Sequence, residues 1–167
     1  MRRFAIAIAF LAALTCLPHV AGAEDARPPS EVLEGLAGTW QFTSDKGTSR
    51  TVKRTLVLGG GFVQAEVTSS DGEPLNIKMY GYDATENVYR AWWFLPGRGR
   101  RQAGTMEFTG TWDEASKTIT LKAEKQGFTL VNTMTFVDDK SHTMSITVTN
   151  AAGKVVNRTE GKLAKQE

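Results

Sequence analysis

Residues 38–74 read GTWQFTSDKGTSRTVKRTLVLGGGFVQAEVTSSDGEP, and apolar residues tend to recur there at every second position. A period of two is typical of strands with one buried face, and the glycine, aspartate and proline residues between the segments are typical of turns. The same pattern continues as far as Leu163. Because no spacer is long enough for a helical crossover, we expect neighbouring strands to pair antiparallel.

The whole pattern predicts ten strands and a short helix before them. The expected helix spans residues 30–37, with Ser30 as its N-cap and Val32, Leu33 and Leu36 on its apolar face. The expected strands are 38–44, 50–58, 62–69, 75–82, 87–95, 103–112, 117–123, 128–137, 141–149 and 154–163. The predicted fold class is all-β, one antiparallel barrel of eight to ten strands with a short N-terminal helix closing one end.

The first residues have the composition of a secretory signal. Arg2 and Arg3 precede an uncharged apolar run over 4–17, and the small residues 21–23 suit signal peptidase. A transmembrane anchor is the rival interpretation, but the run is shorter than the roughly 20 residues that span a bilayer. We therefore expect a signal peptide at 1–23, an exposed lead-in at 24–29, a single barrel domain at 30–167, and a periplasmic or secreted protein.

The remaining composition excludes several classes. Without the two arginines of the signal, 18 basic residues balance 18 acidic residues, which argues against non-specific nucleic-acid binding. The only cysteine lies in the signal, so the barrel has no disulfides. About 144 residues still suffice for a stable core. Since residues 24–167 contain one histidine and no cysteine, a tetrahedral zinc site is not expected.

Polar residues in phase with apolar ones are the candidates for a ligand site. Arg54 alternates with Val52 and Leu56, and Asn132 lies between Leu130 and Met134. If these faces point inward, an arginine needs a partner, because an unpaired buried charge is costly. A ligand carboxylate or phosphate matches the guanidinium geometry, whereas reversed faces or a wet barrel rim would leave the same residues merely solvated.

The strand at 87–95 offers a third arginine. Arg90 alternates with Val88, Trp92 and Phe94, and the opposite face is also aromatic, so parity alone does not orient this strand. We expect the Arg90 face to line the cavity, unless Glu66 or Glu107 pairs with Arg90. The predicted ligand-binding residues are Arg90, Trp92, Arg54 and Asn132.

No catalytic motif stands out. His142 is in phase with Met144, Ile146 and Val148, and an inward histidine could be an axial haem ligand, but a position at the rim is the simpler interpretation. No nucleophile elbow is present, so no enzyme, cofactor or metal is predicted.

The segment 36–40, Leu-Ala-Gly-Thr-Trp, resembles the opening of the calycins, the superfamily of lipocalins and fatty-acid-binding proteins. That resemblance implies that Trp40 plugs one barrel end and that Arg158, in the last strand, packs across it. The segments 59–62, 81–83 and 111–113 resemble a bacterial secreted family catalogued as a domain of unknown function. This likeness covers residues 33–163 and implies the same barrel, without indicating an activity.

Two functions follow as hypotheses. The first is a non-enzymatic periplasmic or secreted protein that binds a small apolar or amphipathic ligand, neutral or anionic, inside the barrel. The second is an envelope interaction or structural module with a filled core. An enclosed pocket of roughly 300 Å³ or more favours the first, and a centre filled by side chains favours the second.

Overall fold

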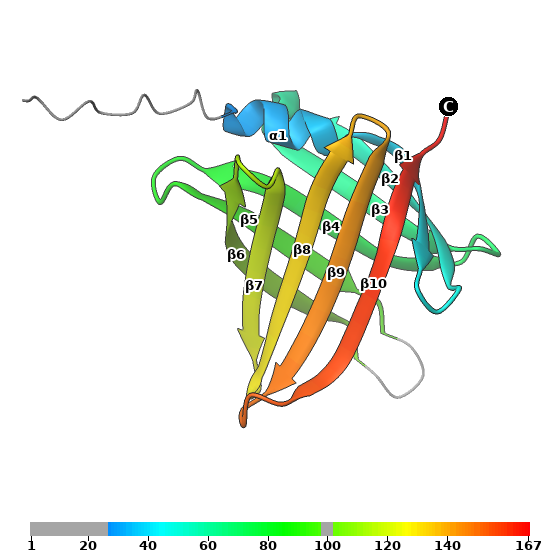
Figure 1. Cartoon of the computed structure of the whole chain (residues 1–167), viewed down its shortest axis with the longest axis vertical. Coiled ribbons are helices and arrows are strands. Elements are labelled where there is room, and N and C mark those ends of the chain that lie inside the picture. Colours follow the sequence, from blue (N-terminus) through cyan, green and yellow to red (C-terminus); the bar gives the residue numbers. More distant parts are fainter. Residues whose placement is uncertain (1–26, 98–101) are drawn as a thin grey trace, which may run out of the picture.

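A computed structural model describes residues 27–97 and 102–167, which form one closed antiparallel barrel with a helix across one end (Figure 1). The elements, in chain order, are α1 (Pro29–Leu36), β1 (Gly38–Ser44), β2 (Ser49–Val57), the 3-10 turn η1 (Leu58–Gly60), β3 (Phe62–Ser69), β4 (Pro74–Asp83), β5 (Val88–Leu95), β6 (Gly104–Asp113), β7 (Thr118–Lys125), β8 (Phe128–Asp138), β9 (Ser141–Asn150) and β10 (Val155–Lys165). The predicted signal peptide at 1–23 lies outside the described residues.

Every strand pairs with its neighbours in the sequence, and the pairing of β1 with β10 closes the barrel. The first and last residues of the strands agree with the predicted ones to within two residues. The reason is that the alternation of apolar and polar residues, and the turn residues that follow, mark where each strand begins and ends. No described helix is long and apolar enough to cross a membrane.

Helix α1 differs from the prediction at its first turn. The expected N-cap was Ser30, but the helix begins at Pro29, with Pro28 in the N-cap position and no side-chain cap. Proline suits the first helical position because it has no N–H that would be left unpaired there. Val32, Leu33 and Leu36 are buried as predicted and pack onto the barrel end.

The barrel is solid in the half next to α1. Side chains there are almost completely inaccessible, among them Trp40, Leu36, Phe108, Ile119, Leu121, Met134 and Leu163. Toward the other end, the inward-facing Met106, Leu130, Ile146 and Val148 are only half-buried, and Phe128 is exposed. The interior is therefore closed at the helix and accessible at the opposite end.

Strand β5 faces the opposite way from the prediction, and β4 also turns its more apolar face outward. In β5 the buried face consists of Tyr89, Ala91 and Trp93, so Arg90 and Trp92 point outward. The reason is the pairing of Ala91 with Tyr80 and Phe108, both buried, which fixes this face as the inner one. In β4 the more apolar face, formed by Leu75, Ile77 and Met79, points outward, and Ile77 is 44% exposed. Asn76, Lys78 and Tyr80 face the interior instead.

Candidate functional site

Arg54, on β2, is the most deeply buried charge in the described part of the barrel, with 5% of its surface exposed. It lies between Gly38 on β1 and Ala65 on β3, two small residues that leave room for its long side chain. Its Nη2 donates a hydrogen bond to the sulfur of Met134 at 3.3 Å, and its guanidinium lies 5.7 Å from the Trp40 ring centroid. The other two nitrogens, Nε and Nη1, have no hydrogen-bond partner in the described structure.

A small cavity adjoins this guanidinium. Its volume is about 40 Å³, and its lining residues come from β1, β2, β3, β4, β9 and β10: Phe42, Arg50, Val52, Arg54, Val67, Asn76, Lys78, Tyr80, Met144, Ile146 and Leu163. Two more cations therefore share the cavity with Arg54, namely Arg50 and Lys78. The Nζ of Lys78 lies 3.9 Å from the Trp93 ring centroid, a cation–π contact that partly compensates its burial.

All of the charged side chains that line the cavity are basic, and none of its lining residues is acidic. Burial, together with the charges of Arg54 and Arg50, lowers the pKa of Lys78 to about 7. Burial also lowers the pKa of Arg54, partly opposed by Tyr80, and raises the pKa of the Tyr80 hydroxyl. The charge of Lys78 is thus disfavoured by burial and by two guanidinium groups, at a place that offers hydrogen-bond donors and no counter-charge.

Two buried amides extend this polar interior. Asn132 faces inward, as predicted, and is 1% exposed, with neither its Oδ1 nor its Nδ2 paired in the described structure. The Oδ1 of Asn76 is likewise buried without a partner among these residues. Buried side-chain amides without a hydrogen-bond partner are uncommon in folded proteins.

His142 is packed between aromatic rings. Its ring centroid lies 4.2 Å from that of Trp40 and 4.2 Å from that of Phe136, in stacked geometry on both sides. Burial lowers its pKa to about 3, and the charges of Arg54 and Lys165 act in the same direction. His142 lies near the barrel end, as expected for the second residue of β9, but the aromatic rings cover it there, and its side chain is 1% exposed.

Trp40 closes the barrel end as expected, but a different cation accompanies it. Its Nε1 donates a hydrogen bond to the Leu36 carbonyl at 2.9 Å, which ties the plug to α1. The predicted partner Arg158 is exposed instead and pairs with Glu160. The Nζ of Lys165 lies 5.4 Å from the Trp40 ring, because Lys165, and not Arg158, is in register with Trp40.

The position and the partners of Arg90 exclude it as a ligand-binding residue inside the barrel. Arg90 lies on the outer wall and forms salt bridges with Asp83 at 3.1 Å, Glu86 at 2.5 Å and Glu107 at 3.0 Å. Its charge is already satisfied by three carboxylates. Trp92 lies beside it on the outer face, 6.3 Å from the Phe62 ring, and lines a surface depression and not the interior.

Sequence reasoning placed Arg54 and Asn132 in the interior correctly and missed Arg50, Lys78 and Asn76. Arg50 carried a usable signal, because it alternates with Val52 and Arg54. Lys78 carried none in its own strand, where Ile77 and Met79 form the more apolar face. Only its register opposite Ala65 places it inside.

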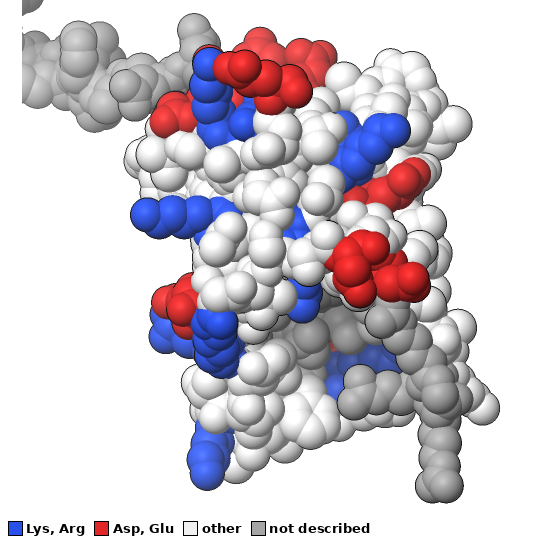
Figure 2. Space-filling view, turned by 90° about the vertical axis from the view of Figure 1, so that its right-hand side faces the viewer, with Lys and Arg blue, Asp and Glu red and all other residues white. Residues whose placement is uncertain are grey.

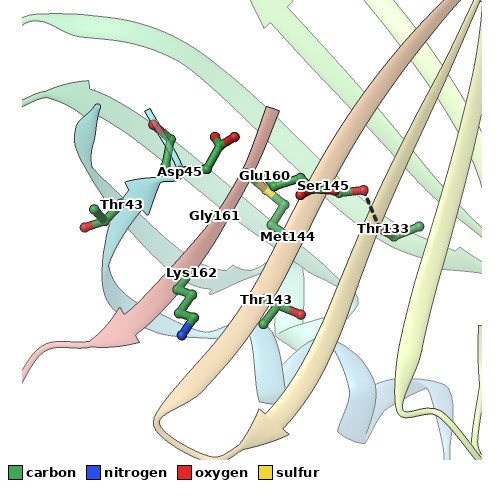
Figure 3. A pocket seen from close by; sticks show the side chains of 10 residues that line it. Thr43, Asp45, Thr133, Thr143, Met144, Ser145, Glu160, Gly161 and Lys162 are labelled. Carbon is green, nitrogen blue, oxygen red and sulfur yellow. Dashed lines mark hydrogen bonds between the residues drawn. The ribbon is translucent and has the colours of Figure 1, made fainter. Parts of the chain in front are cut away.

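A larger groove of about 560 Å³ lies on the wall formed by β1, β8, β9 and β10 (Figure 3). It is lined mainly by hydroxyl-bearing and charged side chains, and Thr133 and Ser145 hydrogen-bond each other at 3.0 Å. None of the buried unpaired side-chain atoms belongs to it. The face seen in Figure 2 carries basic and acidic residues interspersed, so the internal cations are not the continuation of a basic patch on that face. The cavity beside Arg54 is therefore the stronger candidate.

Among the described residues, no group of three His, Cys, Asp or Glu side chains is placed to hold a metal ion. The comparison with curated proteins finds no match. One similar solved structure is a protein with unknown function from the DUF3598 family of Nostoc punctiforme PCC 73102. It is 8% identical, with 84% of this chain and 100% of that chain covered. Its TM-score is 0.22, and at that value the likeness carries no argument.

The comparison with protein families matches nearly the whole barrel. Residues 25–165 match the family described as "Protein of unknown function (DUF1579)". The match begins before α1 and ends at the last residue of β10, so it includes the cavity and all of the residues that line it. The chain therefore belongs to the DUF1579 family.

Proposed function

We propose that this protein is a non-enzymatic binding protein, periplasmic or secreted, which holds the anionic head group of a small molecule inside its barrel. A carboxylate is the group that fits best, because it accepts two parallel hydrogen bonds from one guanidinium. The proposed contacts are Nε and Nη1 of Arg54, with Lys78 and Arg50 supplying further positive charge.

The observation that carries this proposal is the state of Arg54. A guanidinium that is 95% buried, with one bond to a thioether and two unpaired nitrogens, is costly to the folded protein. Thioether sulfur is a weak acceptor and contributes little compensation. A bound anion would supply both the missing acceptors and the missing charge.

The cavity volume limits what is bound there. About 40 Å³ is well below the roughly 300 Å³ that favours a pocket for a whole ligand. It corresponds to about three water molecules, at roughly 10–15 Å³ each. A carboxylate, with three heavy atoms, has a similar size. The enclosed part of the site therefore suits a head group, and the rest of the ligand must lie elsewhere.

One observation favours a second candidate, the interaction or structural module. The half of the barrel next to α1 is filled by side chains, as that function requires. The same filled half would also hold the residues of a binding site rigidly in place, so it is compatible with both candidates. The unpaired cations distinguish the two candidates, because a purely structural core gains nothing from them.

The export and the absence of catalysis are parts of the proposal that rest on the sequence. Residues 1–23 have the pattern of a signal peptide. The lining of the cavity combines three basic side chains with Tyr80, Asn76 and six apolar side chains, and none of its lining residues is a carboxylate or a serine, threonine or cysteine nucleophile. Such a lining suits binding more than turnover.

Titration calorimetry with octanoate at pH 6.5 tests the proposal. We expect Arg54→Met to weaken octanoate binding at least tenfold, or about 1.4 kcal/mol. Arg158→Met removes the same charge from an exposed position and should leave the affinity unchanged. Octanol, which has the tail without the charge, should bind poorly. Equal affinity of the wild-type protein for octanoate and octanol, or unchanged octanoate binding by a folded Arg54→Met variant, would overturn the proposal.

A further inference from the structure

An unpaired hydrogen-bond acceptor lies among the donors of the cavity beside Arg54. Asn76, on β4, is opposite the buried Val67 in the β3–β4 pair, so its side chain lies on the inner face, where it lines the cavity. Its Oδ1 is buried and has no hydrogen-bond partner in the described structure. The remaining polar side chains of the lining are three basic ones and Tyr80. The cavity therefore presents an unpaired acceptor together with unpaired donors.

The neighbouring cations of the described structure do not satisfy this acceptor. Lys78 follows Asn76 on the same face of β4, but its Nζ lies 3.9 Å from the Trp93 ring centroid. The Nη2 of Arg54 donates to the sulfur of Met134, and its Nε and Nη1 have no partner. A buried polar atom that remains unpaired destabilises the folded protein. A ligand that satisfied only the guanidinium would leave the amide oxygen unpaired.

The unpaired nitrogens of Arg54 require an acceptor, and the unpaired oxygen of Asn76 requires a donor. Building on the proposed function, we propose that the ligand is a 2-hydroxy carboxylate. Its carboxylate accepts hydrogen bonds from Arg54, and its hydroxyl donates one to Asn76. Asn76 then distinguishes this class from plain carboxylates, because an analogue without the hydroxyl leaves a buried polar atom unpaired.

The cavity volume restricts where the hydroxyl can lie. The volume of about 40 Å³ corresponds to roughly three water molecules. Two carboxylate oxygens and one hydroxyl oxygen occupy three such positions. A hydroxyl on the carbon next to the carboxylate keeps the three oxygens together, whereas a hydroxyl further along the chain needs enclosed volume for the carbons between them. The position next to the carboxylate is therefore favoured.

Two alternatives use the same kinds of atom. A singly protonated phosphate also carries acceptors and a donor, but its four oxygens exceed the roughly three positions that the cavity holds. Asn132 is another amide that could accept from the hydroxyl, because its polar atoms are buried and unpaired in the described structure. It is not among the residues that line the cavity, whereas Asn76 is. Asn76 is therefore favoured.

Titration calorimetry with octanoate and with the two enantiomers of 2-hydroxyoctanoate tests this assignment. The guanidinium of Arg54 and the amide of Asn76 are fixed on separate strands, β2 and β4, so they should select one enantiomer. We expect that enantiomer to bind the wild-type protein at least tenfold more tightly than octanoate does. Asn76→Leu, which is similar in size and has no polar side-chain atom, should lose this preference.

Controls locate the partner of the hydroxyl. Asn132→Leu removes the other unpaired amide and should retain the preference for the hydroxy acid. Asn157→Leu changes an exposed asparagine of β10 and should leave all of the affinities unchanged. Octyl phosphate should bind the wild-type protein more weakly than the preferred hydroxy acid. Thermal unfolding verifies that each variant folds, and the comparison of ligands in the wild-type protein needs no variant.

The outcomes separate this inference from the proposed function. Equal affinity of the wild-type protein for octanoate and both hydroxy acids, with binding lost in Arg54→Met, would overturn the role of Asn76 while leaving the anion site in place. Loss of the preference in Asn132→Leu and not in Asn76→Leu would also overturn it, in favour of Asn132. Tighter binding of octyl phosphate than of either hydroxy acid would overturn the carboxylate class. Absence of binding for every anion would overturn both proposals.

Discussion

The guanidinium of Arg54, on β2, donates its one described hydrogen bond to the thioether sulfur of Met134, on β8, at 3.3 Å. Sulfur in a thioether accepts hydrogen bonds weakly, so this contact orients the guanidinium without neutralising it. The other two nitrogens have no partner in the described structure, and no acidic side chain lines the cavity that Arg54 borders. The arrangement keeps a strong donor available for an acceptor that the described barrel does not supply.

If Arg54 serves ligand binding and destabilises the unliganded fold, replacing it should increase the free energy of unfolding. We expect Arg54→Met to raise the free energy of unfolding, by about 1–4 kcal/mol, because an apolar side chain of similar length removes a buried, poorly paired charge. Urea unfolding without ligand measures this change. Arg158→Met, at an exposed position, should stay within about 0.5 kcal/mol of the wild type. A clear loss of stability in Arg54→Met would mean that the arginine serves the fold.

Lys78 should make the unliganded protein more stable as the pH rises. Its pKa is about 7 in the folded protein, against an ordinary value of 10.5. Between these values the unfolded chain binds a proton that the folded one does not, so the free energy of unfolding rises with pH in that window. Lys78→Met should be more stable than the wild type below about pH 7, and the difference should vanish as the pH approaches 10.5. The urea midpoint at several pH values measures it.

Carboxylate binding should have the opposite pH dependence. Lys78 is protonated below pH 7 and attracts an anion there, so octanoate affinity should fall as the pH rises through 7. The groups around it are Arg54 and Arg50, whose charges help to lower the pKa of Lys78, and Tyr80, whose hydroxyl has a pKa raised by burial. Lys78→Met should abolish the dependence, and Lys53→Met, on the outer face of β2, should retain it. A wild-type affinity that is constant from pH 6 to pH 9 would remove Lys78 from the site.

His142 should limit stability in acid. Its pKa is about 3 when folded, against 6.5 ordinarily, because the ring is buried between Trp40 and Phe136. As the pH falls from 6.5 toward 3, the unfolded state takes up a proton that the folded state refuses, at up to about 1.4 kcal/mol per pH unit. His142→Phe keeps an aromatic ring, so it should lose less stability than the wild type between pH 6.5 and pH 4. Parallel acid unfolding curves for the two proteins would refute this.

Two glycines of β6 provide a matched test of the barrel geometry. A Cβ on Gly110 would lie 1.8 Å from the Thr120 carbonyl oxygen on β7, so Gly110→Ala must separate two paired strands. A Cβ on Gly104 would meet nothing within 4 Å. We expect Gly110→Ala to destabilise by more than about 3 kcal/mol and Gly104→Ala to be nearly neutral. Thermal unfolding of both variants checks this, and similar melting temperatures would show that β6 and β7 are not paired in this way.

The fold was predictable because each strand carries its own signal. Alternation and turn residues gave the ends of β1 and β3 without error. Strand orientation was predictable only where one face is clearly apolar, as for Ile119, Leu121 and Ala123 in β7. In β5 both faces are aromatic, so pairing with β4 and β6 decides which one is buried.

The site residues were predictable only where the pattern within a single strand shows that they face the interior. Arg54 and Asn132 interrupt apolar faces within their own strands, and both lie inside. Lys78 lies opposite Ala65 across the β3–β4 pair, a relationship between strands that no pattern within one strand contains. Arg90 failed as a candidate because its three carboxylate partners come from β4, the following turn and β6.

The most direct test of the central claim, that an anion binds at Arg54, is the NMR signal of its side-chain Nε–H. Its signal is assigned by its disappearance in Arg54→Met, and dodecanoate is then added to the wild-type protein. We predict that the Arg54 signal moves downfield and exchanges more slowly with solvent, because its unpaired nitrogen gains a charged acceptor, while the Arg158 signal stays in place. An Arg54 signal that is unchanged at saturating dodecanoate would contradict the account.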